Sequence, residues 1–596
     1  MDLSADLINY FCLPYGAYLD YQAALSTHQD IADDHDSIHL DSLLPAQPSW
    51  RIDGCDGQGT QFLALPIFLS PNLVPLRVDV YIPDQTKHPT HLRKALGSAG
   101  AFCIRDQRVN SLGITKLVLL ALERWTAEQE DFAARFHALP FGSRIILENI
   151  TDNVEDIRVR MVADHKTERQ LLPVSKLQQL WGDIPIAGWP ETISLTDLEH
   201  CRQLHDTISL VRIKGGSGDQ FFIFKSSVNE VRYVYHELKL LLTMPPHPNI
   251  IPRPLFLVTG ADRYGGEDKV YGFLMEHHQQ GNLADILAYR SQMGTLTRKD
   301  QFRWAREIAS TLIEINNGPA GFYSELKPDN LLLSCADDRT ETETEERVVF
   351  IDFEQLGNWF TLSAPEVHYL EWVLKLSKCN EVPEDERRRF AQLVDDHMPI
   401  QPAGDPIYDN PAAGYYRPWM NFSAAEQEAA EVFSLGKTLW CVFEGRCDTR
   451  NSILKAFKHH DDDDSSAALE FPHFRATPEP VRQLIRECTR GNRDGESGRV
   501  EVVRRGWRVY PRGRSGIEGE PLGTAREAME AARRMWQQRI AEMEEFLAAR
   551  TRWQRGEGRE GDVELLGYPG RPSLREVVNR LTIIADECVD TRKVIH

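Results

Sequence analysis

The sequence predicts an α+β protein built from more than one domain. The chain has 596 residues, and since a single hydrophobic core stops growing well below that length, about three to four units of about 150 residues are expected. Its 42% apolar and 26% charged residues are ordinary for a globular chain and exclude a fibrous or wholly disordered protein. Period-two runs typical of strands alternate with longer runs of helical period.

Residues 1–190 are expected to form an α+β region of unknown function. Residues 76–82 (LRVDVYI) alternate between apolar and polar side chains, which predicts a half-buried strand. Residues 114–135 are predicted to form a helix, and residues 143–150 a second strand. The region either forms a separate domain or braces the domain that follows it.

The pattern changes near residue 190, after the Pro/Gly-rich run GDIPIAGWP, which marks a domain boundary. Residues 207–213 and 220–225 are two β-rich runs joined by KGGSGD, and adjacent glycines supply a positive φ at little cost. The two runs therefore predict a hairpin. Residues 229–244 follow as a helix with one apolar face.

A long helix is expected near the C-terminal end. From Ala525 to Leu547, apolar residues recur in steps of three and four and form one stripe. This helix either packs on its own domain, or forms a coiled coil or binds a partner protein. Glutamates interleaved with its arginines argue against contact with nucleic acid.

The charge, cysteine and hydropathy patterns limit which partners and which cellular compartment are expected. The formal net charge of −21 argues against nucleic acid as a partner. The ten cysteines form no C-x-x-C pair, which is typical of reduced thiols in an intracellular protein, cytoplasmic or nuclear. The start MDLSADLINYF lacks a basic secretory segment. No apolar run approaches the roughly 20 residues of a membrane span, so no membrane is expected as a partner.

The chemistry concentrates in two runs, GFYSELKPDNLLL from Gly321 and VVFIDFEQLG from Val348. They resemble the catalytic loop and metal-binding segment of eukaryotic protein kinases, whose consensus is H-R-D-L-K-x-x-N followed by D-F-G. Glu325 lies five residues before Asn330, as the kinase aspartate lies before its asparagine. One such short match is weak, but several in the correct order are a strong signal.

Upstream residues extend the resemblance. Lys225 ends the run FFIFK, where the kinase nucleotide lysine stands, and Glu237 on the next helix takes the part of its ion-pair partner. Met275, Glu276 and His278, in the run MEHH, resemble the hinge that binds adenine. The resemblance therefore implies an ATP site between these segments.

Downstream residues extend it further. Ala364-Pro365-Glu366 matches the A-P-E motif, and Arg571 resembles the arginine that pairs with the glutamate of that motif. Glu431, in EVFSLG, replaces the aspartate that ties a buried helix of the large lobe to the catalytic-loop backbone.

The fold that the resemblance implies is bilobal and protein kinase-like. A small β-rich lobe at about 191–276 is expected to sit on a helical lobe at about 277–596, with ATP in the cleft. Insertions relative to the family are expected near 334–347, 370–420 and 490–568.

The expected roles follow the chemistry of phosphoryl transfer, which needs charge neutralisation on the phosphates and a positioned acceptor. Asn330 and Asp352, brought together by two neighbouring strands, offer oxygen ligands suited to Mg²⁺. Lys225 would hold the α- and β-phosphates, Lys327 would neutralise the transferred phosphoryl group, and Glu325 would act as the base. The resemblance implies an ATP- and Mg²⁺-dependent kinase acting on serine or threonine of protein substrates.

The sequence also departs from the family pattern. The longer side chain of Glu325 displaces the catalytic carboxylate, and displacements of about 1 Å can cost about a hundredfold in rate. Glu354 replaces a glycine and adds a charge near the metal ligands. The phosphate loop expected at 199–206 contains no glycine, so nucleotide affinity is either weak or supported by Arg202. Ser324 replaces the arginine that gathers an activation-loop phosphate, which argues against that form of control.

These departures leave a second interpretation open, in which the chain is a pseudokinase that binds nucleotide or partner proteins as a scaffold. A third interpretation is a phosphotransferase for small molecules. The A-P-E segment and the loop of Ser/Thr type argue against the third.

Overall fold

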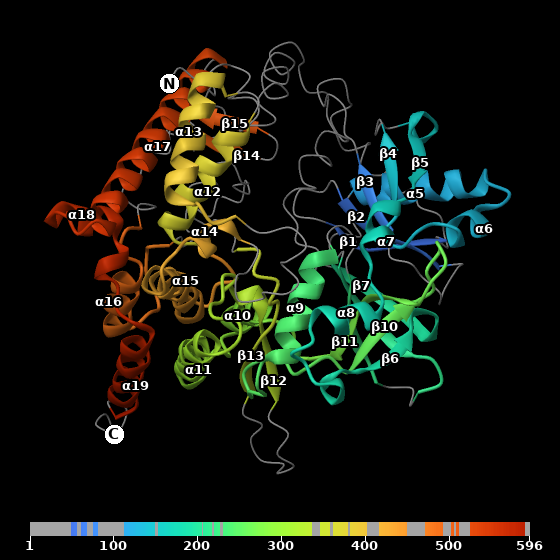
Figure 1. The fold of residues 1–596 in the computed structure, drawn as a ribbon, viewed down its shortest axis with the longest axis horizontal. Helices are drawn as coiled ribbons and strands as arrows, with labels where there is room; N and C mark the ends of the chain where they lie inside the picture. The colour runs from blue at the N-terminus through green and yellow to red at the C-terminus, as the bar shows by residue number, and fades with distance from the viewer. Residues whose placement is uncertain are drawn as a thin grey trace.

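The computed structural model describes residues 49–55, 61–67, 76–80, 113–148, 153–205, 207–216, 220–226, 231–335, 346–357, 362–379, 382–401, 416–449, 471–492, 502–505, 508–511 and 525–590. Within these residues the chain is an α+β structure, in which two sheets and a group of helices occupy different parts of the molecule (Figure 1). The predicted α+β class is confirmed. Most of the insertion expected at 334–347 lies outside the described residues.

The first sheet is built from the N-terminal part of the chain. Its elements are β1 (Trp50–Cys55), β2 (Gln61–Pro66), β3 (Leu76–Val80), α5 (Gly113–Ala127), α6 (Phe132–His137), β4 (Arg144–Glu148) and β5 (Arg158–Val162). The strands lie in chain order, and all pairs are antiparallel except for β3 with β4. The strands predicted at 76–82 and 143–150 are confirmed.

The single helix predicted over 114–135 is wrong, because the chain turns at 128–131 and forms α5 and α6 instead. The turn returns Phe132 to the core. Its ring meets Trp125 edge-on at 5.3 Å and Trp50 at 5.8 Å between centroids. Burying these three aromatic side chains together outweighs continuing the helix through four polar residues.

The second sheet follows in sequence. The elements are α7 (His165–Gln170), α8 (Val174–Leu180), β6 (Glu191–Ser194), β7 (Leu198–His205), β8 (Ile208–Ile213), β9 (Phe222–Ser226), α9 (Val231–Thr243), β10 (Phe256–Gly260) and β11 (Lys269–Glu276). The strand order is β6-β10-β11-β9-β8-β7, with only β6 and β10 parallel. The predicted β8–β9 hairpin and the predicted helix at 229–244 are confirmed.

The first sheet contacts the edge strand β7 of the second. Arg51 Nη2 donates a hydrogen bond to Cys201 O at 2.9 Å, and Gln203 N donates to Asp53 Oδ2 at 2.7 Å. Both contacts fall where β7 shifts register against β8, which leaves backbone groups of β7 available to β1. These contacts favour the bracing interpretation of the N-terminal region.

Residues between the two sheets pack on the second one. The buried Trp181 ring stacks on Trp189 with 5.5 Å between centroids. The Tyr235 hydroxyl on α9 accepts a hydrogen bond from Leu172 N at 2.9 Å. The domain boundary near residue 190 stays a prediction, since the segment before it belongs to the same hydrophobic cluster as the sheet after it.

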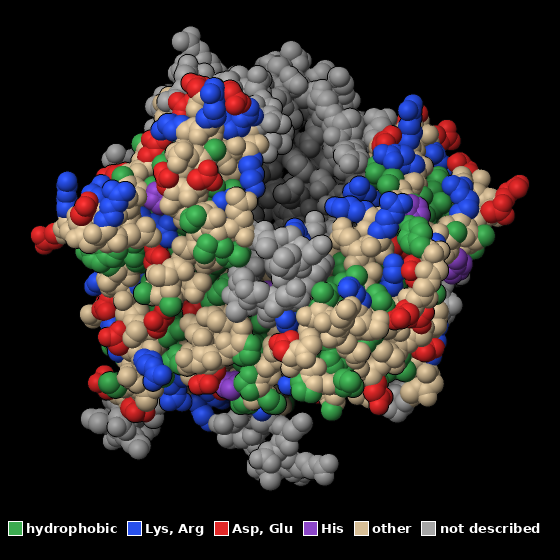
Figure 2. All heavy atoms as spheres, viewed as in Figure 1, with side chains coloured by type: hydrophobic (Ala, Val, Ile, Leu, Met, Phe, Trp, Pro, Cys, Tyr) green, Lys and Arg blue, Asp and Glu red, His purple; other side chains and the backbone are tan. Residues whose placement is uncertain are grey.

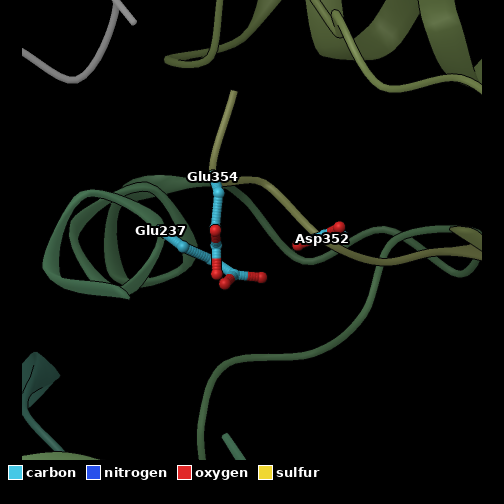
Figure 3. A group of neighbouring side chains, drawn as sticks. All are labelled: Glu237, Asp352 and Glu354. Atoms are coloured by element: carbon cyan, nitrogen blue, oxygen red, sulfur yellow. The ribbon is translucent and has the colours of Figure 1, made fainter. Parts of the chain in front are cut away.

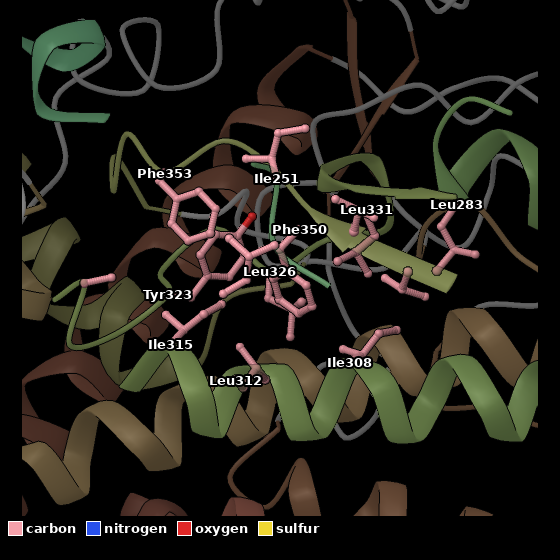
Figure 4. Close-up of a cluster of buried hydrophobic side chains, with 14 of the residues drawn as sticks. Ile251, Leu283, Ile308, Leu312, Ile315, Tyr323, Leu326, Leu331, Phe350 and Phe353 are labelled. Atoms are coloured by element: carbon pink, nitrogen blue, oxygen red, sulfur yellow. The ribbon is translucent and has the colours of Figure 1, made fainter. Parts of the chain in front are cut away.

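The remaining elements form a mostly helical part. They are α10 (Leu283–Met293), α11 (Arg298–Asn317), β12 (Leu331–Cys335), β13 (Glu346–Phe350), α12 (Pro365–Lys378), α13 (Glu384–His397), α14 (Arg417–Met420), α15 (Ala424–Glu444), α16 (Glu479–Cys488), β14 (Val502–Arg505), β15 (Arg508–Pro511), α17 (Ala525–Gln554), α18 (Glu560–Leu566) and α19 (Leu574–Asp590). Ile308, Leu312 and Ile315 on α11 lie beneath Phe350 and Phe353 (Figure 4). One hydrophobic cluster therefore continues from the second sheet into this helical part.

Helix α17 confirms the helix predicted at 525–547 and continues to Gln554. Ile540, Met543 and Leu547 are buried in one cluster with residues of α12. This half of the stripe packs on its own chain. The apolar side chains of the stripe before Gln537 lie outside those that the structure describes.

Among the described residues, no helix combines the length and the apolar character needed to cross a membrane. Figure 2 shows acidic and basic side chains mixed over the described part of one face. Charges of both signs at short range weaken the field that such a face presents to a charged partner.

The ion pair expected between Glu366 and Arg571 is present. Arg571 Nη1 and Nη2 lie 2.5 and 3.0 Å from the two carboxylate oxygens of Glu366, and Nη1 also donates to Ala429 O at 2.9 Å. The side chains are 0% and 1% exposed for Arg571 and Glu366. The pair thus joins α12, α15 and the segment that leads into α19.

Arg571→Ala is expected to lower the free energy of unfolding by ~3–5 kcal/mol, because it leaves the Glu366 carboxylate buried without its cation. Urea unfolding measures the loss. Arg580→Ala is the matched control: the Arg580–Glu487 pair is partly exposed, so its loss should cost no more than ~1 kcal/mol. Equal losses in the two variants would contradict a structural role for the Glu366–Arg571 pair.

Candidate functional site

The hairpin of β12 and β13 brings Asn330 and Asp352 together. The two strands pair antiparallel with Leu331 opposite Phe350, so the residue before β12 and the segment after β13 lie at the same end. Asn330 Nδ2 donates a hydrogen bond to Asp352 Oδ2 at 3.3 Å. The predicted meeting of this amide and carboxylate is confirmed.

Lys225 on β9 is the centre of the charged cluster. Its ammonium forms an ion pair with Glu237 on α9, as expected, and lies 2.7 Å from Asp352 Oδ1 and 3.0 Å from Glu354 Oε1. Figure 3 shows Glu354 and Glu237 pointing toward one another from the segment after β13 and from α9. The lysine therefore joins the second sheet, α9 and the β13 side of the hairpin.

The cluster holds fixed charges of both signs. Burial acts to lower the pKa of Lys225, but Asp352, Glu237 and Glu354 outweigh it and hold this pKa well above its ordinary value. Burial acts to raise the pKa of Asp352, but Lys225 and Lys327 outweigh it and lower this pKa. At neutral pH the lysine is thus a cation and Asp352 an anion.

The acidic side chains are arranged so that some could hold a metal ion. Ligand oxygens of Glu237, Asp352 and Glu354 all lie within 4.8 Å of one another. The Asp352 side chain keeps 27% of its surface exposed, against 1% for Glu237 and 13% for Glu354. Carboxylate and amide oxygens suit Mg²⁺, so Asp352 with Asn330 fits this ion best, and Glu354 offers a further oxygen.

Glu325 uses its extra methylene to reach backbone. Its Oε1 accepts a hydrogen bond from Leu356 N at 2.5 Å, and the residue is 5% exposed. Burial and then the nearby Asp352 raise the pKa of Glu325 well above its ordinary value. Lys327, also buried, acts to lower this pKa, but it does not outweigh burial and Asp352. The carboxyl group predicted as the base is thus engaged with the segment after Asp352.

The three predicted hinge residues lie at the end of β11. Met275 is buried and Glu276 exposed, opposite Ile223 and Phe222 of β9. His278 follows the strand, and burial lowers its pKa. Their contact with adenine stays a prediction.

Residues 199–205 of the segment predicted as the phosphate loop lie in strand β7, which pairs with β8 from Ile208 onward, so the segment forms a strand over most of its length and not a loop. Arg202 is exposed on β7, opposite Leu210. The imidazole of His205, at the end of β7, lies close enough to Asp352 and Glu354 to act on their carboxylates electrostatically. His205 was not predicted from the sequence, since only the pairing of β7 with β8 brings it near the acidic cluster.

Glu431 ties α15 to the backbone of the segment that was predicted as the catalytic loop, as the resemblance implied. Its two carboxylate oxygens accept hydrogen bonds from Tyr323 N and Asn316 Nδ2, each at 2.5 Å. The residue is 0% exposed, and burial raises the pKa of Glu431 to about 8.

No protein-family model matches this chain, and no curated protein matches it either. Function is therefore inferred from the geometry of the site together with the sequence resemblance.

Glu431→Gln is expected to flatten the pH dependence of stability. The folded protein keeps the Glu431 proton up to about pH 8, whereas an ordinary glutamate loses it near pH 4.5. Between these values the folded state binds the extra proton, so this group makes stability fall as pH rises, by up to about 1.4 kcal/mol per pH unit. Urea unfolding between pH 5 and pH 8 measures the slope.

The amide that Glu431→Gln introduces can be accommodated. Within the described residues Asn316 Oδ1 has no hydrogen-bond partner, and if the Asn316 side-chain amide flips, this oxygen can accept a hydrogen bond from the new glutamine Nε2. Glu444→Gln is the matched control. Burial acts to raise the pKa of Glu444, but hydrogen bonds from Thr477 and backbone amides outweigh it and lower this pKa. Its replacement should therefore leave the slope above pH 5 unchanged. A wild-type slope in Glu431→Gln would refute the assignment.

Proposed function

We propose that the chain is an ATP- and Mg²⁺-dependent phosphotransferase that resembles protein kinases and acts on serine or threonine of protein substrates. In this proposal the six-stranded sheet with α9 forms the small lobe of a bilobal fold. The helices from α10 onward form the large lobe, and ATP binds between the two.

One observation carries the proposal: a buried lysine, two acids and an amide from four separate segments meet at one point. Lys225 Nζ pairs with Glu237 and lies 2.7 Å from Asp352 Oδ1, while Asp352 accepts from Asn330 at 3.3 Å. A lysine is seldom buried unless it is paired. Here the pairing leaves Asp352 and Asn330 beside it as oxygen ligands, which is the combination that a metal–triphosphate needs.

The roles follow from these positions. Lys225 would bind the α- and β-phosphates, held in place by Glu237. Asp352 and Asn330 would hold Mg²⁺, which neutralises charge on the phosphates. Lys327 acts electrostatically on Asp352 and would neutralise the transferred phosphoryl group.

Mg²⁺ with ATP is expected to stabilise the wild type against thermal unfolding, by about 2.7 kcal/mol at a hundred times the dissociation constant. Asp352→Asn should abolish this shift, because it removes a metal ligand with little change of shape. Asp395→Asn, at an exposed position on α13, is the control and should keep the shift. A wild type that does not respond to millimolar nucleotide would refute the site.

A second candidate function, nucleotide binding without transfer, is favoured by the engagement of Glu325 with Leu356 N. A carboxyl group that accepts from backbone is less available to an acceptor hydroxyl.

Phosphoryl transfer from γ-labelled ATP separates the two candidates. If Glu325 is the base, Glu325→Gln should lose at least a hundredfold in transfer rate while its thermal shift with Mg²⁺ and ATP persists, since the amide oxygen can still accept from Leu356 N. If the chain only binds nucleotide, neither protein transfers label and both show the shift.

A further inference from the structure

Gln355 combines burial with an unusual backbone. It is 1% exposed and has a φ of 54°. Among the described residues, only Asp352 shares a positive φ without being glycine. Such conformations persist where the surroundings hold them, and they cluster at functional sites. Gln355 follows Asp352 by three residues, so the strain lies within the candidate site.

The Gln355 side chain uses both of its polar atoms. Nε2 donates hydrogen bonds to Ala320 O at 3.1 Å and to Phe322 O at 3.0 Å. Since the amide nitrogen faces two carbonyls, Oε1 is the acceptor, and His236 Nε2 at 2.8 Å is its donor. One glutamine thus links α9 to the backbone before the catalytic loop.

The neighbours of Gln355 also form hydrogen bonds to α9 and to the segment predicted as the catalytic loop. Phe353 N donates to Glu237 Oε1 on α9 at 3.1 Å, and Leu356 N donates to Glu325 in the catalytic loop. Lys225 pairs with Glu354 between them. The segment 352–356 is therefore bonded residue by residue to β9, α9 and the catalytic loop.

We propose that Gln355 is a positioning residue for nucleotide binding. Gln355 joins His236 on α9 to the carbonyls of Ala320 and Phe322, a connection that we call the α9 latch. The latch holds Glu237, the residue after His236 on α9, against Lys225. The phosphate-binding lysine is then set in place without an external signal. The part of this proposal that concerns nucleotide rests on the proposed function.

Two further observations agree with a site that is assembled permanently. Ser363, in the segment where an activating phosphate would be added, is 4% exposed, and Ser324 is 1% exposed. Burial lowers the pKa of His236 to about 4, so its ring stays neutral across the physiological range. The α9 latch therefore depends neither on a phosphate at Ser363 nor on a change of pH between 5 and 8.

Two variants test the latch, and a third serves as the control. Gln355→Met removes all three hydrogen bonds at nearly constant volume, and His236→Phe removes only the bond to α9. Gln301→Met is the matched control: Gln301 is also buried, and its Nε2 also donates to two backbone carbonyls, those of Val442 and Phe443. Gln355→Gly suits the left-handed backbone and replaces Gln355→Met if that variant fails to fold.

The first readout is hydrogen exchange of the α9 amides without any ligand. The latch predicts exchange at least tenfold faster in Gln355→Met and His236→Phe than in wild type, and no change in Gln301→Met. If His236→Phe exchanges like wild type, Gln355 supports only the loop at 320–322, and the latch is refuted.

The second readout is the dissociation constant of ATP with Mg²⁺, measured by calorimetry well below the melting temperature. It should rise at least tenfold in both latch variants and stay unchanged in Gln301→Met. Unchanged affinity in all variants would refute the positioning role while leaving the proposed function intact. A wild type that binds no nucleotide would refute both the proposed function and the positioning role, and hydrogen exchange would then decide whether the latch itself holds α9.

Discussion

Burial of the Lys225 ammonium is the constraint on which the candidate site depends. Removing an ammonium from water costs several kcal/mol unless it is paired with good geometry. Glu237, Asp352 and Glu354 supply that pairing from α9 and from the segment after β13. The requirement therefore fixes how the second sheet, α9 and the β12–β13 hairpin lie together. Burial raises the pKa of Glu237 to about 7 and also raises the pKa of Glu354, so Asp352, whose pKa is lowered, is the carboxylate best suited to hold a divalent cation.

Departures from the kinase pattern place side-chain contacts where that pattern has glycine or a shorter residue. Glu354 stands at a glycine position and contacts Lys225 at 3.0 Å. The turn after β7 contains no glycine and places His205 near the acidic cluster. Glu325 reaches Leu356 N through its additional methylene. Together these contacts tie the second sheet and the β12–β13 hairpin to one another through side chains, and the N-terminal sheet adds a further support at β7.

The meeting of the charged residues was predictable, because the resemblance to protein kinases indicates their places from their order along the chain. Lys225 and Asp352 are examples. Gln355 was not predictable: a glutamine beyond a motif looks like a solvated loop residue until the fold brings the carbonyl of Ala320 beside it. The prediction of a single helix over 114–135 failed for a related reason. Four polar residues resemble an exposed helical face, and only the burial of Phe132 decides otherwise.

A crystal structure with Mn²⁺ and a non-hydrolysable ATP analogue tests the central claim most directly, because manganese is located by its anomalous scattering. The account predicts a manganese peak within ligand distance of Asp352 and Asn330, with phosphate oxygens on Lys225. It also predicts that the Lys225–Glu237 pair and the His236–Gln355 bond stay unchanged from the present structure. Nucleotide bound elsewhere, or a candidate site that stays empty at saturating concentrations of both manganese and the analogue, would contradict it.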